Sequence, residues 1–136
     1  MTGGDKGAAA VEAALLTPLL IALVLLIVLA GRLASADLTV TATAHAAARA
    51  ATLERTPAAA EAAAQRAAAN NLRTHDLSCA AHSLRLDTGG LEPGATVRVR
   101  LTCRVDLGDL SGLGVPGTHT VWADSSAVVD LYRGTP

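Results

Sequence analysis

An uninterrupted apolar run near the start of the chain constrains its fold more than any other feature. Residues 13–31 carry no charged side chain, and Glu12 and Arg32 bracket them. A helix of these 19 residues would be about 28 Å long, close to the roughly 30 Å hydrocarbon thickness of a bilayer. Twelve of the residues are Leu, Ile or Val, which together favour insertion by up to about 6 kcal/mol. We therefore predict a transmembrane helix within residues 8–31.

A removable secretory signal is the main alternative for this run. The sequence "ASA" at 34–36 resembles a small-x-small cleavage site, so signal peptidase could release a soluble binding domain after Ala36. The apolar run is longer than the hydrophobic region of such signals, which spans about 7–15 residues. Pro18 and Glu12 are also unusual in them. These features favour a helix that stays in the membrane.

The flanking segments predict how the chain crosses the membrane. Lys6 precedes the span, whereas Arg32 and Asp37 follow it, so flanking charge is nearly even. The segment before the span is too short to fold outside the cell. We therefore expect a single-pass protein of the cell membrane, with a cytoplasmic N-terminus and an extracytoplasmic C-terminal part.

Gly7 and Glu12 give the start of the run a recognisable pattern. A glycine followed by small apolar residues, with a glutamate at the fifth position after it, resembles the processing signal of type IV pilins and pseudopilins. In that family, prepilin peptidase cuts after the glycine. The resemblance implies a leader of residues 1–7 and cleavage between Gly7 and Ala8. The family usually has Phe after the glutamate, and position 13 here is Ala.

The order of the later segments narrows this resemblance. The span is followed by "ATAHAAARAATLERTPAAAEAAAQRAAANNL" and then by a strand-rich part with two cysteines. This order resembles TadE-like proteins, the minor pseudopilins of tight-adherence (Tad, Flp-type) pilus systems. The resemblance implies a non-catalytic role in assembling a pilus or a related secretion apparatus. It implies prepilin peptidase, pilin and other pseudopilin subunits, and the inner-membrane assembly platform as partners. An unprocessed, membrane-anchored accessory protein stays open as an alternative.

Charge pairing gives a physical reason for the spacing. If cleavage frees the amine of Ala8, Glu12 lies four residues further along, on the same helical face. An ammonium and a carboxylate near the lipid edge are each costly alone and less costly when paired. The amine can belong to the same chain or to an adjacent subunit. The simpler interpretation is a carboxylate favoured by the helix dipole, worth under about 1 kcal/mol.

The Ala-rich region predicts helices beyond the membrane. We expect one helix from about residue 9 to 54, and an Ala-rich helical stalk over 32–73 with a break near 55–57. Thr56 and Pro57 suit the N-cap and first position of a second helix. That helix is expected to run to about Ala69 and to stop at Asn70–Asn71.

The remaining residues, 74–136, predict a small β-rich domain. Apolar and polar residues alternate without a break over 95–107, which is typical of a half-buried strand. A partner strand is expected at 81–87, joined by a hairpin loop, and a third strand within 118–133. The expected fold class is α+β, with a three-stranded antiparallel sheet packed on the Ala-rich helices.

Cys79 and Cys103 are the two cysteines of the chain, and we expect them to form a disulfide. The bond would close a loop of about 25 residues and stabilise the domain by about 3.5 kcal/mol. Two free thiols are the alternative. Cys79 has the wrong parity for the inward face of 81–87, so it must precede that strand or lie at a bulge.

Arg98, Arg100 and Arg104 form a basic stripe on the outward face of the clearest strand. A solvated strand face is the simple interpretation, and contact with an acidic pilus subunit is the sharper one. Nucleic acid is not favoured, because no aromatic residues interleave the arginines and the net charge is −1.

No catalytic or metal-binding motif emerges from the sequence. The four histidines are scattered, without metal-ligand spacing, and no nucleophile motif or phosphate-binding glycine loop occurs. We expect no enzyme activity, cofactor, metal or small-molecule substrate. The histidines are His45, His75, His82 and His119.

Overall fold

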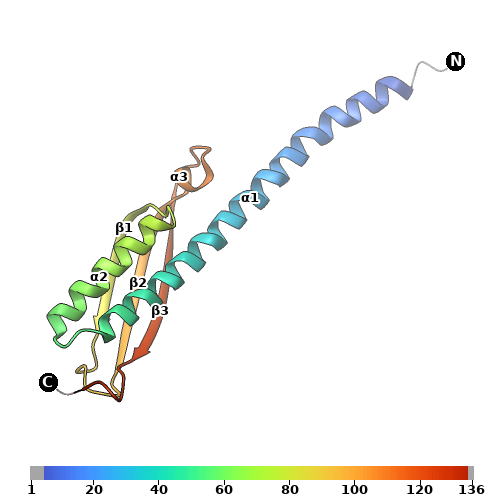
Figure 1. Ribbon diagram of the computed structural model, residues 1–136. Coiled ribbons are helices and arrows are strands. Elements are labelled where there is room, and N and C mark those ends of the chain that lie inside the picture. The colour runs from blue at the N-terminus through green and yellow to red at the C-terminus, as the bar shows by residue number, and fades with distance from the viewer. Residues whose placement is uncertain (1–4, 135–136) are drawn as a thin grey trace.

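A computed structural model describes residues 5–134 of the chain. It shows an α+β fold, which confirms the predicted class: a long helix, a second helix and a three-stranded antiparallel sheet. The long helix projects far beyond a small head that contains the sheet (Figure 1). Residues 1–4 of the predicted leader lie outside the described residues.

Helix α1 (Asp5–Thr52) is continuous through the predicted span and the first Ala-rich segment. It starts four residues earlier and ends two residues earlier than the predicted range 9–54. Pro18 lies inside the helix without ending it. A threonine-rich patch further along is also helical, and each of three hydroxyl groups there is satisfied by donating to the carbonyl four residues earlier. These donors are Thr39, Thr41 and Thr43, at 2.7–2.9 Å.

Helix α2 (Pro57–Thr74) starts as predicted but ends later. The side chain of Thr56 accepts a hydrogen bond from the Ala59 amide at 3.2 Å and caps the helix. The predicted end at Asn70–Asn71 is wrong. Asn71 instead contacts α1, where its side-chain amide lies 3.2 Å from the Thr43 hydroxyl oxygen, and Leu72 is buried. These tertiary contacts outweigh the low helix propensity of asparagine.

Three strands form the sheet in the order β1-β2-β3: β1 (Cys79–Asp87), β2 (Thr96–Asp106) and β3 (Thr118–Val128). Both pairings are antiparallel, and the register places Leu84 and Ala123 on either side of Leu101. Helices α1 and α2 lie side by side over one face of this sheet (Figure 1). Within residues 5–134, no element covers the other face.

A short helix, α3 (Leu107–Ser111), follows β2. Its sequence carries a start and a stop signal. The side chain of Asp106 accepts from the Gly108 amide at 2.7 Å, and Gly112 ends the helix in the left-handed region at φ 67°. The sequence signals were present, but five residues are too few to show a helical period.

The core lies between the helices and the inner face of the sheet, and its two sides differ in residue size. The helices contribute almost only alanine, whose small side chains let the helix axes approach the sheet closely. The strands contribute larger residues, chiefly Val97, Val99, Leu101 and Val105, all nearly or fully buried. The buried alanines of α1 and α2 are Ala36, Ala44, Ala47, Ala48, Ala51, Ala60, Ala63, Ala64 and Ala68.

Candidate functional site

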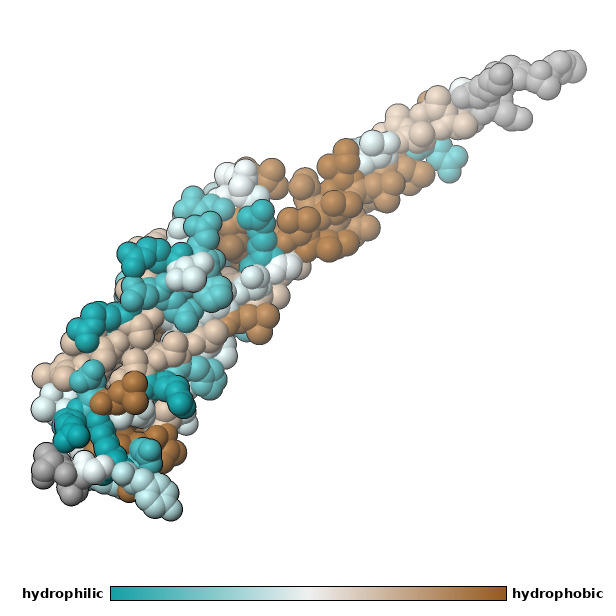
Figure 2. Space-filling model, viewed as in Figure 1, coloured by the Kyte–Doolittle hydropathy of each residue, from teal (hydrophilic) through white to brown (hydrophobic). Residues whose placement is uncertain are grey.

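The N-terminal half of α1 is the first candidate surface. Its apolar side chains between Val11 and Val28 are exposed and form a continuous hydrophobic surface beyond the head (Figure 2). The helix is long and apolar enough to cross a membrane. The hydroxyl of Thr17 donates to the Ala13 carbonyl at 2.7 Å, so this polar group in the span is bonded within the helix.

Gly7, Ala8 and Glu12 lie in the first turns of α1. Glu12 is exposed, and it is one helical turn from Ala8, as the four-residue spacing requires. The three predicted processing residues thus lie at the N-terminal end of the apolar surface.

The predicted disulfide between Cys79 and Cys103 is confirmed, with the two Cα atoms 5.4 Å apart. The register of β1 shifts between Cys79 and Ala81, and this bulge turns Cys79 toward the inner face. Cys79 can therefore face inward, although the alternation of residues 81–87 alone would place it on the opposite face. The bond ties the start of β1 to the middle strand, where Cys103 is fully buried.

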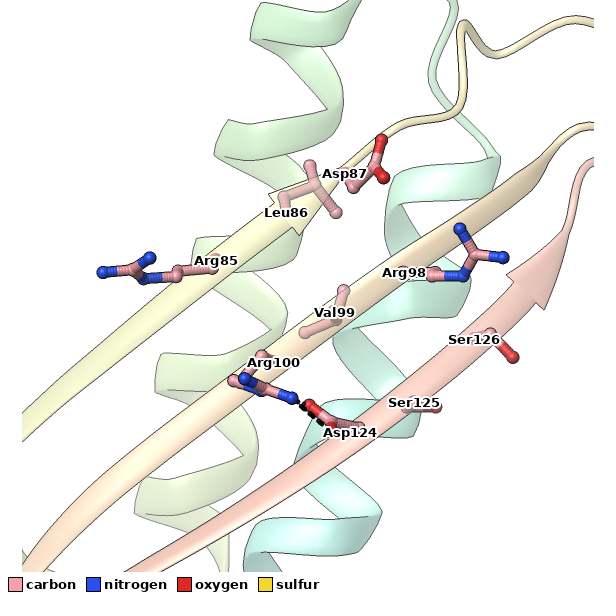
Figure 3. Close-up of a pocket in the computed structure, with 9 residues that line it drawn as sticks. All are labelled: Arg85, Leu86, Asp87, Arg98, Val99, Arg100, Asp124, Ser125 and Ser126. Atoms are coloured by element: carbon pink, nitrogen blue, oxygen red, sulfur yellow. Dashed lines mark hydrogen bonds and ion pairs between the residues drawn. The ribbon is translucent and has the colours of Figure 1, made fainter.

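The uncovered face of the sheet is the second candidate surface, and it carries the predicted arginine stripe. Arg98, Arg100 and Arg104 all lie exposed on it. Arg100 points to Asp124 on β3 (Figure 3), and its Nε and Nη2 donate to the two carboxylate oxygens at 2.6 and 2.8 Å. The guanidinium also lies over the Trp122 ring, 5.8 Å from its centroid.

Of the three arginines in the stripe, only Arg100 takes part in this ion pair. The hydrogen bond from Arg100 lowers the pKa of Asp124 below its ordinary value, and the same bond raises the pKa of Arg100. Among the described residues, the Arg100–Asp124 ion pair is the only one within 4.0 Å. Arg98 and Arg104 are therefore the stripe residues most open to an external acidic group.

A shallow cavity of about 520 Å³ lies on this face between the three strands (Figure 3). All three strands contribute to its polar lining, which consists of Arg85, Asp87, Arg98, Arg100, Asp124, Ser125 and Ser126. Charges of both signs line it, which suits a polar protein surface better than a single anion. The described residues contain no group of three His, Cys, Asp or Glu side chains that could hold a metal ion.

Several connecting residues gave no signal in the sequence. Nδ1 of His45 and the hydroxyl of Ser125 lie 2.7 Å apart and join α1 to β3. Arg133 donates to the carbonyls of Thr52, Leu53 and Glu54 at 3.0, 2.6 and 2.6 Å, and so caps the end of α1. These pairs are about 80 positions apart in sequence, and no local pattern announces such contacts.

Comparison with known proteins identifies one family for the N-terminal part of the chain. The model of the family "TadE-like protein" matches residues 7–49. No curated protein and no solved structure matches the chain in the two other comparisons. The match starts at Gly7, includes Glu12 and the apolar surface, and ends within the buried half of α1. Over these residues the chain is similar to the TadE-like family, in agreement with the resemblance in the sequence.

Proposed function

We propose that the chain is a non-catalytic, minor pseudopilin-like membrane protein that takes part in assembling a Tad (Flp-type) pilus or a related secretion apparatus. The match of residues 7–49 to the TadE-like family is the observation that carries this proposal. The matched segment contains Gly7 and Glu12 as well as the span, so it covers the features through which a pseudopilin is processed and assembled.

The arrangement of the chain supports a membrane location with the head outside the cytoplasm. The apolar half of α1 has no partner within the described chain and matches the bilayer in length. The head contains a disulfide, which forms and persists in oxidising compartments. We therefore assign the N-terminus to the cytoplasm and the sheet to the extracytoplasmic side.

Prepilin peptidase is the proposed processing enzyme, and the Gly7–Ala8 bond is its proposed target. This bond lies in the first turn of α1, where the backbone amides have no intrahelical acceptors. Unwinding this turn for cleavage therefore breaks few hydrogen bonds. Cleavage would free an amine four residues before Glu12, where it can pair with that carboxylate or with the carboxylate of a neighbouring subunit.

The proposed partners divide between the two candidate surfaces. The apolar half of α1 would contact the inner-membrane assembly platform and the helices of pilin and other pseudopilin subunits. The arginine stripe would contact an acidic surface of a pilus subunit, chiefly through Arg98 and Arg104, because Arg100 already binds Asp124.

Mass spectrometry of protein extracted from membranes with detergent tests the processing step. A mature chain that starts at Ala8 is the expected result. A chain that keeps Met1 would contradict cleavage and leave an unprocessed anchored protein. A chain that starts at Asp37 and is found in the medium would instead favour the exported soluble domain.

A Glu12→Ala variant tests the role of the carboxylate. The expected result is normal membrane insertion but loss of most pili, because the freed amine of one subunit loses its partner. Glu61→Ala is the matched control, since Glu61 is an exposed glutamate on α2, outside the apolar surface. Normal piliation by both variants would overturn the role proposed for Glu12.

A further inference from the structure

The connection between β2 and β3, residues 107–117, lies at the end of the head that faces the N-terminal half of α1 (Figure 1). It begins with α3 and continues as a glycine-rich loop. Nη1 of Arg32 donates to the Leu110 carbonyl at 3.1 Å. This contact fixes the connection at the level of Arg32, which is the residue where the apolar run ends.

Burial along α1 shows that the head reaches beyond Arg32 toward the span. Ala36 and Val40 are buried under the sheet, and the same helical stripe continues through Leu33 to Leu29, which are partly buried. The other residues of 13–31 are exposed. Leu29 is three residues inside the apolar run, or about 4.5 Å along the helix. Together with the bond from Arg32 to Leu110, this pattern places the tip of the head at the end of the apolar run, where the hydrocarbon begins.

The composition of the tip suits that depth. Residues 110–117, "LSGLGVPG", carry no charge, and the Leu113 side chain is 59% exposed. Gly112 and Gly114 flank Leu113 at φ 67° and 65°, a conformation that favours glycine and lets the loop turn sharply around this residue. The amide of Leu113 donates to the Ser111 hydroxyl at 3.2 Å, and that of Gly112 donates to the Gly108 carbonyl at 3.0 Å. These polar groups are thus bonded internally, as an apolar medium requires.

We infer that residues 110–117 form a second membrane contact, which inserts Leu113 into the interface of the bilayer that α1 spans. The inference rests on the membrane anchoring in the proposed function. An exposed leucine on an uncharged segment suits the boundary between headgroups and acyl chains, where membrane-surface segments bury apolar side chains by about 5–10 Å. Because α1 runs unbroken into the head, one helix alone would leave rotation of the head about its axis free. The second contact fixes this rotation and hence the direction in which the arginine stripe faces.

Single-tryptophan fluorescence in lipid vesicles tests the contact. Trp122 is the one tryptophan of the chain, so Trp122→Phe gives a silent background for new reporters in the full-length protein. Leu113→Trp reports on the loop, and Leu20→Trp reports on the span. Leu53→Trp is the distal control, because Leu53 is 75% exposed at the far end of α1, about 31 Å from Arg32 along the helix.

The expected result is a blue-shifted Leu113→Trp emission that is quenched most strongly by lipids spin-labelled near the headgroup. Leu20→Trp should be quenched most strongly by lipids labelled deep in the acyl chain, and Leu53→Trp should be quenched by neither. Quenching at position 20 without quenching at position 113 would overturn the loop contact and leave the anchoring intact. Absence of quenching at both positions would overturn both proposals.

A neighbouring copy of the chain could also cover Leu113, and the same experiment separates this case. Its signature is a blue shift at position 113 that grows with the protein-to-lipid ratio and shows no quenching by labelled lipid. That outcome would replace the bilayer with a second subunit as the partner of the loop and overturn the inference.

Discussion

The two halves of α1 belong to one continuous helix but meet different surroundings. The half before Arg32 is rich in leucine, isoleucine and valine, and nearly all of it is exposed. In the half after Arg32, one face consists almost entirely of alanine and is fully buried against the sheet and α2. Burial in this helix therefore does not follow side-chain hydrophobicity. Large residues lie where the partner would be a fluid bilayer or another subunit, and small ones where a rigid sheet must approach the backbone.

Loss of the disulfide is expected to have the largest effect on the stability of the head, while leaving the membrane-spanning half of α1 unchanged. Replacing Cys79 and Cys103 by serine should lower the free energy of unfolding of the head by about 3.5 kcal/mol, since the unfolded chain regains the freedom of a loop of about 25 residues. Urea unfolding in detergent micelles, followed by Trp122 fluorescence, measures the loss. Membrane insertion should stay unchanged, because the span does not contact this bond. An unchanged unfolding midpoint would mean that the packing alone holds the sheet.

An oversized side chain tests the alanine face directly. Ala48 is fully buried, so Ala48→Leu should destabilise the head by about 1–3 kcal/mol through overpacking. Ala42→Leu is the matched control, because Ala42 is exposed on the same helix and should change the stability little. The two variants are compared in the same urea titration. Equal effects at both positions would show that the small side chains are not required for the close approach of the sheet.

Replacing Arg133, which contacts the end of α1, is expected to have an intermediate effect on stability. Arg133→Ala should cost about 1 kcal/mol, because the last carbonyl of α1 and the two carbonyls just after it lose a charged donor but can still bind water. Arg133→Lys should restore part of the loss, since lysine keeps the charge but not the forked geometry. Hydrogen exchange of the last turn of α1 is the most direct measurement, and it should speed up more in the alanine variant than in the lysine variant.

The same contrast explains which parts of the structure were predictable. The apolar run, the alternation over 95–107 and the Thr56–Pro57 helix start are local patterns, so the long helix, the central strand and the start of α2 followed from them. The end of α2 did not, because Asn71 and Leu72 are held by contacts with other elements. For the candidate surfaces, the stripe of arginines was visible as alternation. The pairing of Arg100 with Asp124 depends on the register of β2 and β3, which no local pattern specifies.

The smallest expected effect lies on the uncovered face of the sheet. The hydrogen bond from Arg100 lowers the pKa of Asp124 in the folded state below 3.8, its ordinary value, so the folded protein binds this proton less readily than the unfolded chain does. The pair therefore contributes stability above the ordinary value, and this contribution is lost as the pH falls through the lowered pKa. Both side chains are exposed, so solvent screens the contribution and it stays small.

Asp124→Asn removes this titration and isolates its effect. The variant should be slightly less stable than the wild type at neutral pH, and the difference should vanish in acid once the wild-type carboxylate is protonated. Urea midpoints measured across the acidic range test this, with Asp130→Asn as a control at an exposed aspartate beyond the end of β3. A difference that persists in acid would mean that Asp124 acts through the shape of the pair rather than its charge.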